Sequence, residues 1–403
     1  MRSIGPELIS AASDNDPTNV GTAVAVGAQT GYQLSWLALL VAPLLAVVLT
    51  IAGQVGTAAR DDLQSLTLKR YGRGVAAVLL VSVVVVNVVT IAADLQAGAA
   101  GVGLLAGVDS RWLAAPLGAA VAGLLLAGRY GQVVAVLRYL ILGFAAFGAA
   151  AVLAHPDWPR LLAASLIPAL SLRPSVVTGG LALLGTTLTS YVYVWETIGR
   201  GVEEPADATA RRSGPARAGA VIGAVFTAVT LWFMLVAAAA TLGRHRQAAA
   251  SAQEAARALR PLAGAAAADL FAAGLLTSAL VALPVLMAST GYVVGAHFNW
   301  RRGLSERVGR ARGFYATLVA SIGLALVMSA AGIPLIGMLV AASVIGGFGT
   351  PVGLVILVRL ARDAQVMGPQ RISRRLAIAG WAVTVIVGSL GLLAILSAAV
   401  GRS

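Results

Sequence analysis

The 403-residue sequence contains no cysteine, which excludes disulfide bonds and thiolate metal sites. It has only three histidines, His155, His245 and His297, and these lie near the ends of apolar segments, so a histidine-based zinc site has few ligands to draw on. Charge is also scarce, because charged residues make up 11% of the chain and hydrophobic residues 59%. Such a chain cannot cover the surface of a soluble globular protein with polar groups. The composition indicates a polytopic membrane protein.

Apolar runs of membrane-spanning length fill most of the chain. A helix that crosses the hydrocarbon core needs roughly 20 mostly apolar residues, and about eleven runs satisfy this requirement. The predicted spans are residues 6–30, 34–56, 76–105, 112–128, 132–154, 176–200, 216–242, 264–298, 313–331, 334–360 and 376–399. The opening MRSIGPELIS lacks a clean apolar core with a small-residue cleavage site, so we expect the first span to belong to the mature fold.

The basic residues follow the predicted topology. The net charge is +13, and with a cytoplasmic N-terminus most of the 29 lysines and arginines fall in cytoplasmic loops. We therefore expect a multi-pass protein of the cell membrane with lipid as its surrounding partner and with no nucleic-acid partner. The sequence contains no GxxxxGK[ST] loop, so no nucleotide is expected either. The outer loop 243–264 has helical spacing and is predicted as an amphipathic helix on the membrane or as a solvated helical linker.

Ionisable residues inside the spans are few. Asp14 and Asp16 lie in the first span, Asp94 in the third and Glu196 in the sixth. Each costs roughly 2.5 to 3.5 kcal/mol at the centre of a membrane helix, and such residues usually mark a pathway or a site. These four residues are therefore the first candidates for function.

The first span is interrupted by SDNDPTN, Ser13 to Asn19. Pro17 removes a backbone hydrogen bond and disfavours helical geometry at Asp16, so we predict a helix break. Unwound backbone at membrane depth is tolerated where it lines a cavity or is buried in protein. A carboxylate, an amide and freed carbonyl groups are oxygen ligands suited to a hard cation. A proline kink whose polar groups pair with neighbouring helices is the alternative, and the two aspartates favour a binding site.

A transporter made of inverted repeats should carry a second interrupted helix about five spans later. The sixth span meets this expectation with GTTLTSY, where hydrogen-bonding side chains are concentrated at Thr186, Thr187, Thr189, Ser190 and Tyr191. Hydroxyl groups can also bond to the preceding turn of an intact helix. The partner motif in the first span favours a second break.

These paired motifs resemble the Nramp family of divalent metal transporters, in particular a divergent, methionine-free branch related to magnesium and manganese transport. The resemblance is carried by SDNDPTN, GTTLTSYVYVWE and GVEE, with further support from GQVGTAARDDL and AADLQAG in and after the second and third spans. It implies an all-α membrane protein with a LeuT-type inverted five-plus-five repeat and broken helices 1 and 6. The first repeat would be residues 1–154, the second residues 176–360, and residues 376–399 an additional helix.

The resemblance also implies a set of metal ligands. Asp16 and Asn19 would supply side-chain oxygens, and Ser13 and Thr186 would supply backbone carbonyls. Thr189 stands where the family has methionine. A thioether suits soft transition metals, whereas a hydroxyl suits Mg²⁺ or Mn²⁺. Mg²⁺ also keeps several waters and takes only one or two carboxylates, which fits a site with one strong anion.

Several positions depart from the family pattern. Ser190 and Tyr191 stand where the family has proline and histidine, and Glu196 stands where a second histidine would follow. Asp94 matches an aspartate of the family's proton route. We assign four residues to the ion pathway: Asp14, Tyr191, Glu196 and Asp94. The tenth span lacks the amide that would complete a metal shell and has Ser343 there instead.

Other polar residues in the spans have two interpretations. Ser289 and Thr290 could line an ion site against the first helix, although small hydroxyls in packed membrane helices more often bond to a neighbouring helix. Asn87 is expected to make such an interhelical hydrogen bond.

The sequence thus predicts a secondary transporter, not an enzyme, that moves a divalent cation by alternating access at a midplane site between helices 1 and 6. The cation is the substrate, and no cofactor is expected. One alternative is an ion-coupled symporter of a small organic solute on the same fold, in which helix dipoles would bind a carboxylate. Asp16 would repel that anion. A second alternative is an intramembrane hydrolase with Asp14 or Asp16 paired to Asp94, which requires two acids that share a proton. A monomer is plausible.

Overall fold

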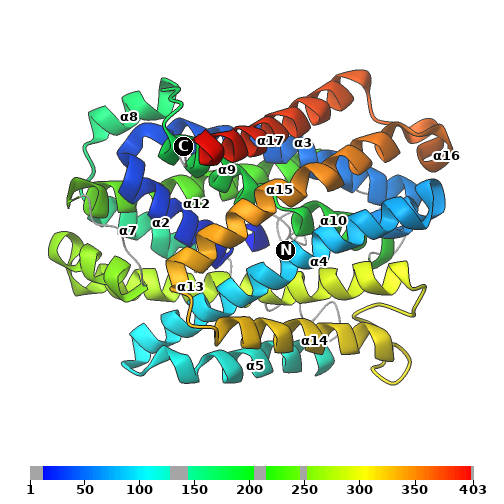
Figure 1. Cartoon of the computed structure of the whole chain (residues 1–403), viewed down its shortest axis with the longest axis horizontal. Coiled ribbons are helices and arrows are strands. Elements are labelled where there is room, and N and C mark those ends of the chain that lie inside the picture. Colours follow the sequence, from blue (N-terminus) through cyan, green and yellow to red (C-terminus); the bar gives the residue numbers. More distant parts are fainter. Residues whose placement is uncertain (1–11, 128–143, 204–214, 246–251, 401–403) are drawn as a thin grey trace.

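The molecule is a bundle of long helices, most of which run along its longest axis (Figure 1). The computed structural model describes residues 12–127, 144–203, 215–245 and 252–400, and within these ranges every regular element is a helix. The helices of the first half are α2 (Pro17–Thr30), α3 (Ser35–Ala59), α4 (Leu63–Ala106), α5 (Ala114–Ala127), α7 (Ala145–Leu153) and α8 (Trp158–Leu166). Those of the second half are α9 (Pro174–Thr187), α10 (Ser190–Ile198), α12 (Pro215–His245), α13 (Ala252–His297), α14 (Arg312–Ser329), α15 (Leu335–Arg362), α16 (Ala364–Met367) and α17 (Arg374–Val400).

Short helical turns join or extend several of these helices. The turn η1 (Gly31–Leu34) connects α2 to α3, and η2 (Ser110–Trp112) precedes α5. The segment η4 (Gly199–Glu203) continues α10 as a π-helix, and η5 (Gly368–Gln370) precedes α17.

Nine segments of the described chain are long and apolar enough to cross a membrane. The first of them, Pro17–Ala59, holds two helices, so it contains most of the predicted spans 6–30 and 34–56. Of the predicted fifth span, 132–154, the structure describes the part that includes α7, and residues 132–143 lie outside the described ranges. The all-helical membrane fold predicted from the apolar runs is confirmed.

Two boundaries differ from the prediction. Helix α4 begins at Leu63, before the predicted span 76–105, and its axis is interrupted at Gly72, whose φ of 80° only glycine adopts readily. Helix α13 begins at Ala252, before the predicted span 264–298, so the expected helix of segment 243–264 is continuous with that span. The short helix α8 was not predicted, because its nine residues are too few for a span and two of its three leucines are exposed.

Both predicted breaks are present. In the first, one helical turn at residues 12–14 is followed by non-helical Asn15 and Asp16, and α2 begins at Pro17. In the second, α9 ends at Thr187 and α10 begins at Ser190. Proline fits the first position of a helix because its missing N–H would have no partner there.

Close helix packing holds the two broken helices in the centre. Helix α12 packs against α2 and α3, α13 against α4, and α15 against α4, α9 and α17. Small residues allow the backbones to approach, as at Gly101, where an added Cβ would lie 2.8 Å from the carbonyl oxygen of Ala272. Small residues at such contacts are typical of packed membrane helices.

The loops predicted to be cytoplasmic meet at one end of the bundle. Arg302 after α13 lies 2.8 Å from Asp62 before α4, and Arg60 donates to the carbonyl oxygen of Arg200 at the end of α10. Arg70 lies 2.5 Å from Asp363 after α15, and its hydrogen bond lowers the pKa of Asp363. These contacts agree with the predicted alternation of loops across the membrane.

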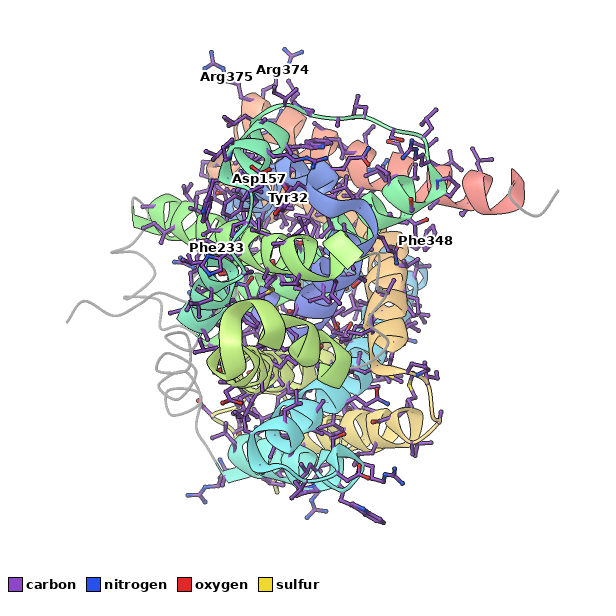
Figure 2. All side chains as sticks on the ribbon, turned by 90° about the vertical axis from the view of Figure 1, so that its left-hand side faces the viewer. Tyr32, Asp157, Phe233, Phe348, Arg374 and Arg375 are labelled. Atoms are coloured by element: carbon purple, nitrogen blue, oxygen red, sulfur yellow. The ribbon has the colours of Figure 1, made fainter. Side chains whose placement is uncertain are left out.

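The same end carries exposed surface arginines. Arg374 and Arg375 at the start of α17 are exposed and project from the surface of the bundle (Figure 2). Arginines at this position would lie beside lipid headgroups in the predicted topology.

Candidate functional site

The first break is organised by Asp16, which caps helix α2. Its Oδ1 accepts a hydrogen bond from the backbone N–H of Asn19 at 2.7 Å, the geometry of an N-cap residue. Asn19 in turn donates from its side-chain amide to the carbonyl oxygen of Asp14. Asp16 and Asn19 therefore lock the two sides of the break together.

The second break faces the first. Leu188 and Thr189 leave helical geometry between α9 and α10, and Thr189 has the extended φ and ψ of −60° and 151°. The hydroxyl of Thr187 lies 3.3 Å from the side-chain oxygen of Asn19 and also bonds to the carbonyl of Leu183 at 2.6 Å. The two breaks thus meet at Asn19 and Thr187.

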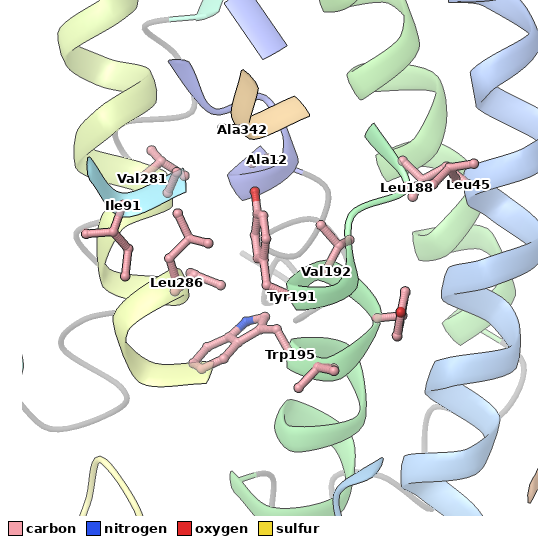
Figure 3. Packing of buried hydrophobic residues seen from close by; sticks show 14 of the residues in the cluster. Ala12, Leu45, Ile91, Leu188, Tyr191, Val192, Trp195, Val281, Leu286 and Ala342 are labelled. Carbon is pink, nitrogen blue, oxygen red and sulfur yellow. The ribbon is translucent and has the colours of Figure 1, made fainter. Parts of the chain in front are cut away.

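Tyr191 connects the second break to both sides of the first. In the first turn of α10, its ring points towards the segment that includes Ala12, one turn away from Trp195 (Figure 3). Its hydroxyl lies 2.6 Å from the carbonyl oxygen of Ser13 and 3.1 Å from Oδ2 of Asp16. A phenol has one proton, so it can donate to only one of these oxygens at a time.

Asp94 of α4 approaches the same helix start from another side. Its Oδ1 accepts hydrogen bonds from the backbone N–H of Thr18 at 3.1 Å and from the hydroxyl of Thr18 at 2.7 Å. The amino-terminal turn of α2 therefore binds two carboxylates, those of Asp16 and Asp94. Free N–H groups and the helix dipole favour negative charge at this end of a helix.

Three carboxylates of this region are deeply buried and have no counter-charge among the residues that the structure describes. The buried acidic residues are Asp14, Asp16, Asp62, Asp94 and Glu196, and the buried basic residue is Arg200. Asp62 is paired with Arg302, and Glu196 lies 3.3 Å from Arg200. The other three, Asp14, Asp16 and Asp94, form no ion pair with a basic residue that the structure describes. Buried carboxylates are normally paired, bound to metal or neutralised by a proton, so these three residues are candidates for binding a cation.

Several oxygen atoms of the site have no hydrogen-bond partner among the described residues. They are both carboxylate oxygens of Asp14, Oδ1 of Asn15, Oδ2 of Asp94 and the hydroxyls of Thr186 and Ser190. All of these residues are at most 2% exposed. No described group of three or more histidines, cysteines or acids forms a conventional metal cluster. A cation here would depend on single carboxylates together with neutral oxygens.

The structure brings together most of the predicted site residues. Ser13, Asp16 and Asn19 are linked through Tyr191 and Thr187, as described above. Thr189 is buried at the second break, with its hydroxyl 3.7 Å from the position of an added Cβ on Gly346. Thr186 is buried beside Thr187, and its hydroxyl has no hydrogen-bond partner within the described ranges.

Glu196 lies apart from this cluster. It sits further along α10, paired with Arg200, and both side chains are 1% exposed. Gly53 of α3 leaves room for it, since an added Cβ there would lie 3.1 Å from Oε1 of Glu196. The GQVG sequence of α3 therefore serves close packing against α10, where Gly56 also approaches the backbone of Thr197.

Three polar contacts were not predicted. Thr18 binds Asp94, Ser278 of α13 donates to the carbonyl oxygen of Asn15, and Thr22 lies 2.5 Å from the hydroxyl of Ser343 on α15. Threonine and serine are common in membrane helices, so composition carried no signal for these pairs. Ser343 contacts α2 at Thr22, beyond Asn19, so it lies outside the break.

Asn87, Ser289 and Thr290 form interhelical hydrogen bonds, as expected. The amide nitrogen of Asn87 on α4 lies 3.0 Å from each of the two hydroxyls on α13. The alternative interpretation was an ion site formed by Ser289 and Thr290 against helix 1. Among the described residues, their hydroxyls bond to Asn87 and to the preceding turn of α13, not to α2.

Two helices broken at facing positions within a bundle of helices are typical of the LeuT-type fold. A nucleobase-cation-symport-1 family transporter, Mhp1 in a closed conformation, has a TM-score of 0.56 at 13% identity over 98% of this chain and 91% of its own. The manganese transporter of Eremococcus coleocola, crystallised with an aromatic bis-isothiourea compound, has a TM-score of 0.73 at 20% identity, over 98% of this chain and 85% of its own. The LeuT-type fold predicted from the paired motifs is confirmed.

Within this class, the chain belongs to the Nramp family. A model of that family, described as natural resistance-associated macrophage protein-like, matches residues 7–397. The divalent metal cation transporter MntH of Deinococcus radiodurans is 27% identical over 397 residues, which cover 95% of this chain and 87% of the relative. MntH of Mycobacterium tuberculosis is 26% identical over 407 residues, 97% of this chain and 90% of the relative. The family predicted from the motifs of spans 1 and 6 is therefore confirmed.

Proposed function

We propose that this protein transports a hard divalent cation, Mg²⁺ or Mn²⁺, through the site where the two helix breaks meet. The observation that carries the proposal is the group of three buried carboxylates, Asp14, Asp16 and Asp94, without a basic partner in the described chain. A carboxylate buried without a partner is strongly unfavourable. A divalent cation would supply the missing charge.

The chemistry of the donors supports a hard cation. Every predicted ligand is an oxygen: the side chains of Asp16 and Asn19, the hydroxyl of Thr189 and the carbonyl groups of Ser13 and Thr186. Oxygen ligands suit Mg²⁺ and Mn²⁺, whereas thioether and thiolate ligands select softer metals. The relatives in the family bear the names of divalent metal cation and manganese transporters, which supports a cation over an organic solute.

Transport would proceed by alternating access between two inverted repeats. Residues 1–154 and 176–360 would form the repeats, with residues 376–399 as an additional helix. In such folds, breaks in the first helix of each repeat place the site near the bilayer midplane, and one bundle moves against the other. The complete burial of Asp16 and Asn19 fits a site closed to both sides.

We further propose that the protein lies in the plasma or inner membrane with its N-terminus in the cytoplasm. This orientation puts the basic end of the bundle, with Arg60, Arg302 and Arg374, on the cytoplasmic side. It also places the break of helix 1 between a cytoplasmic amino-terminal segment and α2.

The test is uptake by the full-length protein in liposomes that contain a Mn²⁺-sensitive dye. We expect Mn²⁺ uptake that Mg²⁺ inhibits and that a mixture of amino acids leaves unchanged. Inhibition by the organic solutes instead would support the symporter alternative. A strong preference for Cd²⁺ over Mg²⁺ and Mn²⁺ would contradict the hard site, because Cd²⁺ favours soft ligands.

A further inference from the structure

Asp14 and Asn15 stand out among the buried polar residues. Both are 0% exposed, and both oxygens of Asp14 and both polar atoms of the Asn15 side chain lack a hydrogen-bond partner among the described residues. Nearly all buried polar groups in proteins have partners, so four unpartnered atoms on adjacent residues require an explanation.

The backbone around these two residues is held firmly. The carbonyl oxygen of Asp14 accepts from the Asn19 amide, and that of Asn15 accepts from the hydroxyl of Ser278. The N–H of Asn15 donates to the carbonyl of Ala12 at 3.2 Å. The hydroxyl of Tyr191 lies 2.6 Å from the carbonyl oxygen of Ser13. The carbonyl groups of Asp14 and Asn15 thus accept hydrogen bonds and that of Ser13 has a donor within reach, whereas the side chains of Asp14 and Asn15 have no partner among the described residues.

Asp14 and Asp16 differ in this respect. Oδ1 of Asp16 accepts from the backbone N–H of Asn19 and Oδ2 lies 3.1 Å from the hydroxyl of Tyr191, whereas neither oxygen of Asp14 has a donor among the described residues. Helix capping and a tyrosine therefore stabilise one carboxylate without any cation. The other carboxylate has nothing in the described chain to offset its removal from water.

We propose that the side chains of Asp14 and Asn15 form a second binding position for the divalent cation, adjacent to the position at Asp16 and Asn19. This inference rests on the proposed function. A carboxylate and an amide oxygen are ligands for a hard cation, which would keep several of its waters here. The Cα atoms of Asp14 and Asp16 are at most about 7.6 Å apart, so two divalent cations would repel each other. One cation would occupy either position and pass between them.

The direct test is a titration of MnCl₂ into the full-length purified protein, followed by calorimetry. We expect Asp14→Asn to weaken binding about tenfold, less than the loss of Asp16, because the cation keeps the position at Asp16 and Asn19. Asn15→Ala should also weaken binding although it changes no charge, which separates ligation from a general electrostatic effect. Asp269→Asn, which removes an exposed carboxylate of α13, is the matched control and should bind Mn²⁺ as the parent does.

The variant Asp16→Asn distinguishes the second position from the first. We expect it to retain weak Mn²⁺ binding that the double variant Asp14→Asn/Asp16→Asn loses. If Asp14→Asn and Asn15→Ala bind Mn²⁺ as the parent does while Asp16→Asn abolishes binding, the second position is wrong and the proposed function stands. If the parent binds neither Mn²⁺ nor Mg²⁺, the proposed function fails and the second position with it.

Thermal unfolding in detergent shows whether the variants fold and tests the same idea independently. Without a cation, Asp14→Asn should unfold at a higher temperature than the parent, because it removes an unpartnered buried carboxylate. Added MnCl₂ should raise the unfolding temperature of the parent more than that of the variant. A lower unfolding temperature for Asp14→Asn without a cation would show that Asp14 has a structural partner, and would overturn the second position.

Discussion

The breaks in helices 1 and 6 differ in charge and in origin. The first contains two carboxylates and is imposed by Pro17, whereas the second contains only hydroxyls and the apolar Leu188. At the first break, side chains from α10 and α13 bind the backbone of Ser13 and Asn15. The second break is held mainly by packing.

Glycine contacts explain how the second break is positioned without a proline. An added Cβ on Gly185 would lie 2.4 Å from the carbonyl oxygen of Ser343 and 2.5 Å from the backbone nitrogen of Gly347. The end of α9 is thus pressed against the backbone of α15, directly before α9 stops at Thr187. The break in helix 1 therefore carries the negative charge of the site, whereas the break in helix 6 contributes neutral groups and is positioned by backbone contact with α15.

The largest effect on this comparison is expected from Asp16→Ala, which removes both the cap of α2 and a charge. Truncation of one member of a buried charge pair costs about 2–5 kcal/mol, so Mn²⁺ binding should weaken at least about 30-fold. Calorimetric titration of the full-length protein measures this. Binding of Mn²⁺ with unchanged affinity would show that the charged break is not the cation site.

The next largest effect is expected from Gly185→Ala. The new methyl group would collide with backbone atoms of α15, and overpacking of this kind typically costs about 1–3 kcal/mol. The unfolding temperature in detergent should fall clearly. Gly337→Ala on α15 is the control, because an added Cβ there meets nothing within 4 Å. Equal unfolding temperatures for the two variants would contradict the packing explanation.

Tyr191→Phe tests the connection between the two breaks. It removes the hydroxyl that donates to the carbonyl of Ser13 or to Oδ2 of Asp16, and an unsatisfied buried acceptor costs about 1–3 kcal/mol. We expect a lower unfolding temperature without a cation and a larger increase on addition of MnCl₂, because the same oxygens become open to the ion. If MnCl₂ shifts the variant and the parent equally, the tyrosine hydroxyl does not compete with the cation.

The smallest effect is expected from Thr187→Val, which removes the neutral contact with Asn19. A hydrogen bond of this kind contributes about 0.5–1.5 kcal/mol, so Mn²⁺ should bind about two- to tenfold more weakly. Thr186→Val keeps the backbone carbonyl assigned to the site and removes a hydroxyl without a partner, so its affinity should match that of the parent. The reverse ranking in the same titration would place Thr186, and not Thr187, at the site.

The breaks, the fold class and the acidic centre could be predicted because they follow from local chemistry. Pro17 cannot continue a helix, Asp16 before it is a natural cap, and apolar runs of this length must span the membrane. The roles of Thr18, Thr22 and Ser278 could not be predicted, since a hydroxyl in a helix can bond to its own preceding turn or to any neighbour.

The sequence by itself determined that this chain crosses the membrane many times, where helices 1 and 6 break, and that Asp14, Asp16 and Asp94 are buried at a cost that requires compensation. Only the tertiary structure decided how each carboxylate is compensated. Asp16 is bound by Asn19 and Tyr191, and Asp94 by Thr18, whereas Asp14 has no partner in the described chain. The physical reason is that hydrogen bonds between helices depend on which faces meet, and that is set by the packing of the whole bundle.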